Sequence, residues 1–349
     1  MTNSTLNVKP SKPWKPSKRE RVIDLLLMVS SIATSYFVVE FTEMKGKLAY
    51  FFVFFAALAI FNLIKGTVTR DFMIGKDQFF SAIMLLGMTL VVLPTASILY
   101  KVFESGRKGL HAGLLTHDMS MATPSDPITS GGLLHAIIGT FLLVFVALIL
   151  SLPIGILTAL YLTEIKGRFT RPIRFLVQAM SGVPSIVAGL FILSSIVFTI
   201  TKSYSGVVGS LALTILMIPT IARTSEEVLN LIPNDLREAG VALGGTQWRT
   251  VAMVVVPAAR SGLITALILG IARIVGETAP ILLLTGGGDS VNFNPTNGAM
   301  GSLPFYIWKS FLLGTEESIT RGWAGLLVLL VLVLLLFTLA RVLGSRRMR

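Results

Sequence analysis

Long apolar runs alternate with shorter polar segments along the whole chain. The runs lie at about 22–39, 48–64, 79–100, 132–162, 174–200, 205–222, 258–284 and 323–343. A helix needs about 20 mainly apolar residues to cross a bilayer, and most of the runs approach or exceed that length. The pattern therefore predicts an all-α integral membrane protein with eight transmembrane helices.

Composition agrees with this class and excludes several kinds of chemistry. Hydrophobic residues make up 53% of the chain and charged residues only 14%, whereas soluble domains carry about 25% charged residues. There is no cysteine, and the three histidines lack metal-ligand spacing. Disulfides, a thiolate nucleophile and a cysteine metal site are therefore excluded, and we expect neither catalytic nor metal-binding residues.

Basic residues indicate which side of the membrane each connecting segment occupies. With the N-terminus inside, 21 of the 30 Lys and Arg residues fall in cytoplasmic segments and eight in external ones. This bias follows the positive-inside rule and predicts that both termini are cytoplasmic. It also accounts for the net charge of +12 without any nucleic acid. The two long external segments, 101–131 and 285–322, are either solvated connectors or a docking surface.

The cytoplasmic segment 223–257 is amphipathic and too long for a simple connector. Pro233 and the pair Gly244–Gly245 divide it into short helices, because proline lacks an amide donor and glycine accepts a left-handed backbone. One face of the middle helix follows the spacing i, i+3, i+4, i+7 and carries Leu236, Ala239, Gly240 and Leu243. This face of small and apolar side chains suits a close fit into a groove on another protein.

The same segment resembles the cytoplasmic signature of permeases of ATP-binding-cassette (ABC) importers. Glu238-Ala239-Gly240 is followed by Gly244, by nine further residues and by Val254-Val255-Val256-Pro257. Gly240 stands where the family usually has alanine. The resemblance implies a coupling helix that contacts a separate ATPase through Leu236, Glu238, Ala239, Gly240, Leu243 and Gly244. An ordinary amphipathic interfacial helix is the alternative.

Nucleotide chemistry is expected outside this chain. The phosphate-binding pattern GxxxxGK[ST] does not occur in the sequence. We therefore expect no cofactor here, with ATP and Mg bound by the partner ATPase.

The run 261–288 is expected to form one helix, and it carries two charges near its middle, Arg273 and Glu277. A charge at the bilayer centre costs about 2.5–3.5 kcal/mol. Small residues spaced by four, Gly262, Ala266 and Gly270, form a close-packing face that the charges continue. We therefore expect both charges to point into a bundle or a cavity. Arg273 could offer planar donors to an anion; a purely structural ion pair is the alternative.

The charged motif closely resembles the signature of phosphate-importer permeases. Gly276 precedes Glu277, and the ending Thr278-Ala279-Pro280 is typical of the PstA branch of that family rather than the PstC branch. Two further stretches agree: a helix-breaking motif at 183–187 (VPSIV) and the pattern YLxE at 161–164.

The resemblance also implies a domain organisation. The family core has six membrane helices of the type I ABC importer kind, which fit runs three to eight. We expect a basic cytoplasmic tail at 1–21, an extra N-terminal helical pair at 22–78 and the permease domain at 79–349.

The function implied by the resemblance is ATP-driven import of inorganic phosphate across the cytoplasmic, or inner, membrane. Arg273 and Glu277 would line the substrate pathway. The implied partners are a PstC-type permease, a PstB-type ATPase dimer, a PstS-type external phosphate-binding protein, phosphate and membrane lipid, with no nucleic acid. Import of another oxyanion, such as sulfate or molybdate, remains an alternative. A secondary transporter would need several intramembrane acids or an inverted repeat, and a purely structural anchor is a weaker alternative.

Overall fold

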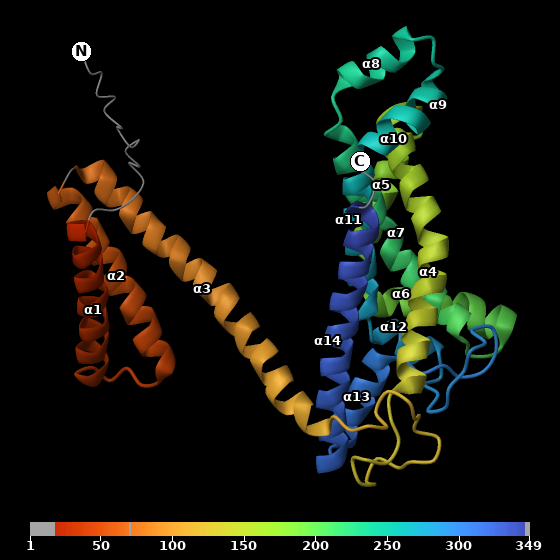
Figure 1. The fold of residues 1–349 in the computed structure, drawn as a ribbon, viewed down its shortest axis with the longest axis horizontal. Helices are drawn as coiled ribbons and strands as arrows, with labels where there is room; N and C mark the ends of the chain where they lie inside the picture. Colours follow the sequence, from red (N-terminus) through yellow and green to blue (C-terminus); the bar gives the residue numbers. More distant parts are fainter. Residues whose placement is uncertain (1–17, 70, 346–349) are drawn as a thin grey trace, which may run out of the picture. The chain divides into compact units, whose positions relative to one another are not determined.

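The computed structural model describes residues 18–69 and 71–345 (Figure 1). Its regular elements are helices, which confirms the all-α membrane class expected from the apolar runs. The chain divides into two compact units between Leu99 and Tyr100. The expected basic tail, 1–21, lies almost wholly outside the described residues.

The first unit contains α1 (Lys18–Glu40), α2 (Lys47–Thr69) and most of α3 (Phe72–Gly106). Polar contacts join α1 to α2. The Ser35 hydroxyl donates to the Tyr50 carbonyl at 2.7 Å, the Tyr50 hydroxyl donates to Oε2 of Glu40 at 3.4 Å, and Lys65 forms an ion pair with Asp24. Many large apolar side chains of these helices are exposed. Such surfaces suit contact with lipid, whose tails are as apolar as leucine.

Helix α7 forms the core of the second unit. It packs against several neighbours, whose bounds are α4 (Leu134–Leu160), α5 (Thr170–Ser181), α6 (Ser185–Ile192), α11 (Arg260–Val275) and α12 (Ala279–Leu284), while α7 itself spans Gly206–Asn230. The crossing with α4 is close enough to require glycine, because a Cβ on Gly155 would lie 2.7 Å from Cγ2 of Ile221. Small residues at helix crossings permit this kind of packing in membranes.

The number of membrane spans depends on two bent helices. Within residues 18–69 and 71–345, six helices are long and apolar enough to cross: α1, α2, α3, α4 with its π-helical extension η2 (Tyr161–Ile165), α7, and α14 (Glu316–Ser345). In one bent pair, α5 meets α6 and its extension η3 (Leu193–Thr201) at 104°. In the other, α9 (Gln247–Thr250), η4 (Val251–Val255) and α10 (Val256–Ala258) meet α11 at 72°. The predicted eight spans are reached if each bent pair crosses as one span.

Prolines explain why two of the apolar runs are not continuous helices. Pro184 stands between α5 and α6, where the sequence resembles a helix-breaking motif. The expectation of one helix through 261–288 is wrong, because α11 ends at Val275 and α12 begins at Ala279. Pro280 cannot donate a hydrogen bond to the carbonyl of Gly276, and its ring would collide with that carbonyl in a continuous helix. The segments after the two breaks, α6 and α12, pack against each other.

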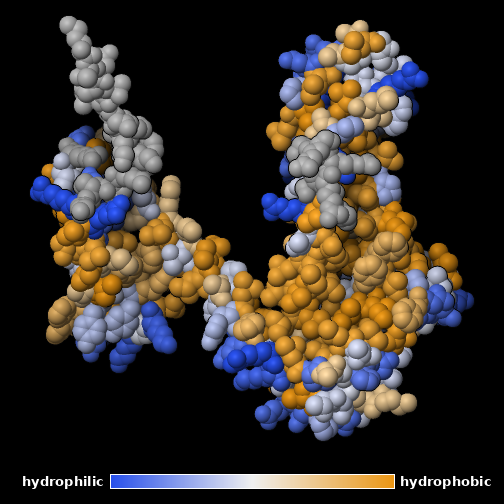
Figure 2. All heavy atoms as spheres, viewed as in Figure 1, coloured by the Kyte–Doolittle hydropathy of each residue, from blue (hydrophilic) through white to orange (hydrophobic). Residues whose placement is uncertain are grey.

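The two ends of the second unit differ in structure (Figure 1). The short helices α8 (Asn234–Ala242), α9 and α10 lie at one end, which we call the α8 end. At the opposite end lie α13 (Leu303–Leu313) and two long segments, 107–133 and 285–302. The first of these begins with the 3₁₀ turn η1 (Arg107–Gly109). Figure 2 shows apolar side chains over the middle of the unit and more polar side chains at both ends, as a membrane-spanning body requires.

The two long segments are interlocked rather than loosely solvated. The Val291 amide donates to Oδ2 of Asp118 at 3.1 Å, and the Met119 amide donates to the Asp289 carbonyl at 3.0 Å. Arg321, near the start of α14, is buried, and its guanidinium donates to five backbone carbonyls at 2.8–3.1 Å, those of Thr123, Pro124, Asp126, Pro127 and Ser130. The first segment is thus held by its neighbours although it has little regular structure of its own.

Candidate functional site

The intramembrane charges meet at the break between α11 and α12. Arg273 lies in the last turn of α11, and Glu277 lies in the break itself. Nη1 of Arg273 donates to Oε1 of Glu277, which makes an ion pair. The Arg273 side chain is 45% exposed and the Glu277 side chain 11%. The carboxylate is therefore largely enclosed, while the guanidinium is open to one side.

The small-residue face of α11 packs on α7, as expected. Ala266 is fully buried, and a Cβ on Gly270 would lie 2.9 Å from Cγ1 of Ile221. Arg273, however, does not continue this buried face. It belongs to a second, exposed stripe made of Ser261, Thr265, Leu269, Ala272, Arg273 and Gly276.

This exposed stripe has an unusual composition for a membrane helix. Leu269 is its one large apolar residue, and the rest are small, polar or charged. Lipid contact favours large apolar side chains, whereas charged residues in membrane segments face a protein interior or a water-filled cavity. The stripe is thus better suited to a second protein or an aqueous pathway than to lipid.

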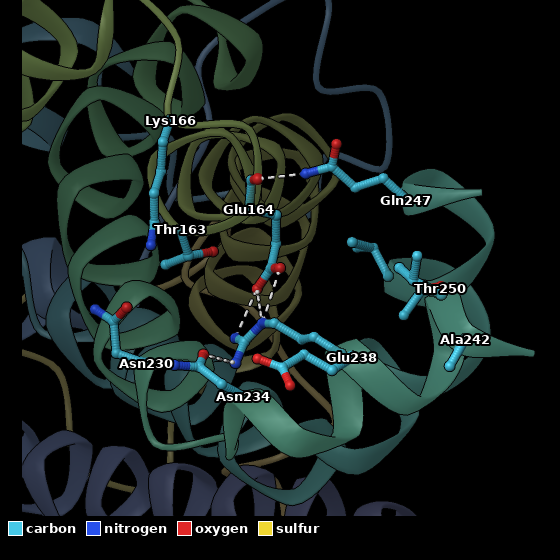
Figure 3. Close-up of a pocket in the computed structure, with 12 residues that line it drawn as sticks. Thr163, Glu164, Lys166, Asn230, Asn234, Glu238, Ala242, Gln247 and Thr250 are labelled. Carbon is cyan, nitrogen blue, oxygen red and sulfur yellow. Dashed lines mark hydrogen bonds and ion pairs between the residues drawn. The ribbon is translucent and has the colours of Figure 1, made fainter. Parts of the chain in front are cut away.

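A second cluster of charges lies at the α8 end, where the cytoplasmic signature was expected. Glu164 is on η2, at the end of α4, and its side chain is only 7% exposed. Arg237, on α8, donates through Nη2 to Oε1 of Glu164 at 2.8 Å and through Nε to Oε2 at 3.0 Å (Figure 3). This bidentate hydrogen bonding raises the pKa of the Arg237 guanidinium above its ordinary value.

The Arg237 guanidinium also binds the chain that precedes α8. Nη1 donates to the Ile232 carbonyl at 2.6 Å, and Nη2 donates to the Leu229 carbonyl at 2.9 Å. From the other side, Nε2 of Gln247 on α9 donates to the Glu164 carbonyl at 2.7 Å (Figure 3). A cavity of about 770 Å³ lies among these residues, lined by α8, η2 and α9.

Comparison with known proteins identifies the family. The model of the family described as "Binding-protein-dependent transport system inner membrane component" matches residues 151–349. Phosphate transport system permease protein PstA 1 of Mycobacterium tuberculosis is 35% identical over 302 residues, which cover 85% of this chain and 94% of that protein. PstA of Pasteurella multocida is 40% identical over 238 residues, covering 67% and 83%. This chain belongs to the PstA family of binding-protein-dependent transport permeases.

Two further proteins are similar to this chain. PstA of Mycobacterium leprae is 41% identical over 219 residues, covering 62% of this chain and 71% of that protein. Among solved structures, an inward-facing MetNI methionine ABC transporter is 24% identical and covers 60% of this chain, with a TM-score of 0.45. A PstA-family chain is an inner membrane component of a transport system, and so one part of a larger assembly.

The PstA-family chain exposes most of the expected coupling face. Leu236 and Ala239 are exposed, and Leu243 is 90% exposed. Gly244 has a φ of +82° with open space around it, as the predicted turn requires. Glu238 is also exposed and lines the cavity (Figure 3).

Gly240 is placed differently from the other residues of that face. It is turned toward α9, where a Cβ would lie 2.5 Å from Cγ2 of Thr250. Gly240 therefore belongs to the internal packing of the segment. This contact leaves no room for a side chain larger than that of glycine at this position.

Sequence reasoning missed Arg237, Gln247 and Thr250, and used Glu164 only as part of a motif. Glu164 and Arg237 are 73 residues apart, so their pairing cannot be found from local spacing. One signal was present, since Glu164 is the first charged residue after the long apolar run of α4. A carboxylate at that boundary is expected to find a basic partner.

Proposed function

We propose that this chain is the PstA-type permease subunit of an ATP-driven importer of inorganic phosphate. The observation that carries the proposal is the Arg273–Glu277 pair, exposed on one side at a helix break inside the membrane region. The names of the PstA relatives supply the substrate class. A guanidinium with a planar set of donors is suited to the oxygens of a phosphate ion.

Glu277 competes with phosphate for the guanidinium of Arg273. When the site is empty, the guanidinium is paired with the enclosed carboxylate. To bind, phosphate must replace Glu277 as the acceptor of hydrogen bonds from Arg273. Phosphate and the Glu277 carboxylate also repel each other, because both are negative. Both effects weaken the binding of phosphate, which favours its release after transit. The break between α11 and α12 would let the two side chains move apart without unwinding a continuous helix.

A second permease subunit is part of the proposal. The exposed stripe of α11 would face a PstC-type subunit, so that the phosphate pathway lies between two similar permeases. Small and polar side chains along the stripe leave room for such a pathway and provide hydrogen-bond partners within it.

The α8 end is proposed to be cytoplasmic, with both termini on that side. The exposed Leu236, Ala239 and Leu243 would enter a cleft of a PstB-type ATPase dimer that binds ATP and Mg. The opposite end would be external, and its interlocked segments would meet a PstS-type phosphate-binding protein. The basic residues of the connecting segments support this orientation.

Substitution of Arg273 by Gln tests the proposal. We expect the assembled importer to form normally and labelled phosphate uptake to fall to background, because Gln keeps hydrogen-bonding atoms but loses the cation. Arg174→Gln is the matched control, since Arg174 also pairs with a carboxylate, that of Glu226, and lies on α5. Unimpaired uptake in Arg273→Gln would refute the translocation role, and competition by sulfate or molybdate equal to that by phosphate would refute the substrate.

A further inference from the structure

Helix α8 is not held by burial of its side chains. All nine residues of α8 are described, and none of them is buried. A cavity of about 770 Å³ separates part of the helix from the end of α4. Apolar packing is the usual source of rigidity between elements, and between α8 and the end of α4 it is replaced by a small number of directed polar contacts.

Arg237 joins α8 to the end of α4 and to the chain that precedes α8. Its guanidinium binds both carboxylate oxygens of Glu164 and the carbonyls of Leu229 and Ile232. Charge-assisted bidentate bonds fix orientation as well as distance. Because Glu164 is enclosed, loss of its partner would leave a carboxylate poorly solvated.

Glu164 receives contacts from both arms of the segment that contains α8. Arg237 reaches its carboxylate from α8, and Gln247 reaches its backbone carbonyl from α9. Glu164 in turn belongs to η2, which continues α4 directly, and α4 packs extensively against the buried α7. A displacement of α8 transmitted to Glu164 would therefore move the core of the unit.

We propose that Arg237 and Glu164 form a strut that transmits displacement of α8 to α4. The proposal rests on the proposed function, because it assigns a role within the coupling of ATP hydrolysis to transport. A second route follows the chain from α9 through α10 to α11 and includes the 72° bend. With both routes intact, α4 and α11, which both pack against α7, move together. Arg237 and Glu164 are positioning residues, since neither contacts the transported ion.

The first experiment measures the rigidity of α8 directly. The natural sequence has no cysteine, so spin labels can be attached at Asp235→Cys on α8 and Ile165→Cys on η2 in the assembled complex. Both positions are exposed. We expect a narrow distance distribution between the labels, which Arg237→Met broadens and Glu164→Gln broadens less. Arg174→Met, which removes the guanidinium of the Arg174–Glu226 pair, is expected to leave the distribution narrow.

The second experiment measures coupling in the reconstituted complex. We expect Arg237→Met to lower phosphate transported per ATP hydrolysed by about tenfold, the order of effect expected for a lost charge-assisted hydrogen bond, while the ATPase still co-purifies. An unchanged distance distribution in Arg237→Met overturns the strut, whatever ion is transported. A broadened distribution with unchanged coupling overturns its role in transmission. A parent complex that shows the narrow distribution but imports no phosphate refutes the proposed function and leaves the strut intact.

Discussion

Gly240 and Thr250 form a contact in which one methyl group decides the fit. A Cβ at position 240 would lie 2.5 Å from Cγ2 of Thr250, well inside normal contact distance. We expect Gly240→Ala to destabilise the α8–α9 region by about 1–3 kcal/mol, as overpacking usually does. ATPase co-purification and protease protection of residues 223–257 would measure the effect.

Thr250→Ala provides the control for this prediction. It removes both Cγ2 and Oγ1, which would lie 2.5 and 2.9 Å from the new Cβ, so the double variant Gly240→Ala/Thr250→Ala should regain most of the lost protection and ATPase binding. If the double variant is as impaired as Gly240→Ala alone, then the contact with Thr250 is not the cause of the defect.

Asp118 links the two long segments at the end opposite α8. Oδ1 accepts from the Ser120 hydroxyl and amide, and Oδ2 accepts from the Val291 amide. The hydrogen bonds, of which that from the Ser120 hydroxyl has the largest effect, lower the pKa of Asp118 below its ordinary value. A carboxyl with a lowered pKa contributes stability above its unfolded-state pKa and loses it as the pH falls through the folded-state value.

The resulting prediction concerns hydrogen exchange at the Val291 amide. We expect protection to be complete above about pH 4, the ordinary pKa of an aspartate, and to be lost as the pH falls further through the lowered folded-state pKa, where the carboxylate becomes protonated. Asp118→Asn should lower protection at every pH, since an amide has one acceptor oxygen for two groups of donors. Protection that is identical in Asp118→Asn and the parent would rule out this link.

At the scale of residues, chemical type could be predicted from the sequence but side-chain partners could not. The pair Arg273 and Glu277 could be found because the two residues are four apart and both are charged within an apolar run. The contacts of Glu164 with Arg237 and of Asp118 with Val291 join residues 73 and 173 positions apart. Such pairs depend on how distant segments of the chain pack, which local patterns do not encode.

At the scale of elements, the turn after α8 gives a direct test of docking. Gly244 has a positive φ, and the space where its Cβ would lie is open. Gly244→Trp should therefore place a large ring on the proposed docking surface and strain the turn by about 1 kcal/mol. We expect co-purification of the ATPase to be lost while the membrane bundle remains folded.

Gly314→Trp is the matched control for that prediction. Gly314 also has a positive φ with open surroundings, and it ends α13 at the opposite end of the unit. It should show the same strain without loss of the ATPase. Equal loss in both variants would attribute the effect to strain, and normal co-purification in Gly244→Trp would refute docking through α8.

The positions of most helices followed from hydropathy, but the helix breaks required more detailed reasoning. Apolar runs indicate which parts of the chain can insert into a membrane, since the transfer of apolar side chains into lipid dominates insertion. They do not show that Pro280 divides one run into α11 and α12, because proline is tolerated in membrane helices when neighbours satisfy the freed carbonyls. At this position the helix is interrupted instead, and the break places Glu277 outside both helices.

At the scale of the whole molecule, we expect the first two helices to be dispensable. The second unit contains its own buried core around α7. Removal of α1 and α2 takes away an even number of spans, so the remaining helices should keep their orientation. A chain that starts at Phe72 after a new initiator Met is expected to insert, to bind its ATPase and to transport phosphate.

Membrane fractionation, co-purification and uptake would measure that prediction. A chain that inserts but neither binds the ATPase nor transports phosphate would show that the extra helical pair is required for assembly. Loss of insertion would show that it is required earlier, for the entry of α3 into the membrane.

Arg321 has a consequence for communication across the membrane. One guanidinium near the start of α14 binds five carbonyls of the segment 123–130. Segment 123–130 is therefore expected to move with α14 almost as one rigid body. A tilt of α14 would displace this segment at the end of the unit opposite α8. In the proposed orientation, this surface faces the outside, and its shape depends on the conformation of the helix bundle. A soluble phosphate-binding protein would therefore meet a different surface in each conformation, before any phosphate is transferred.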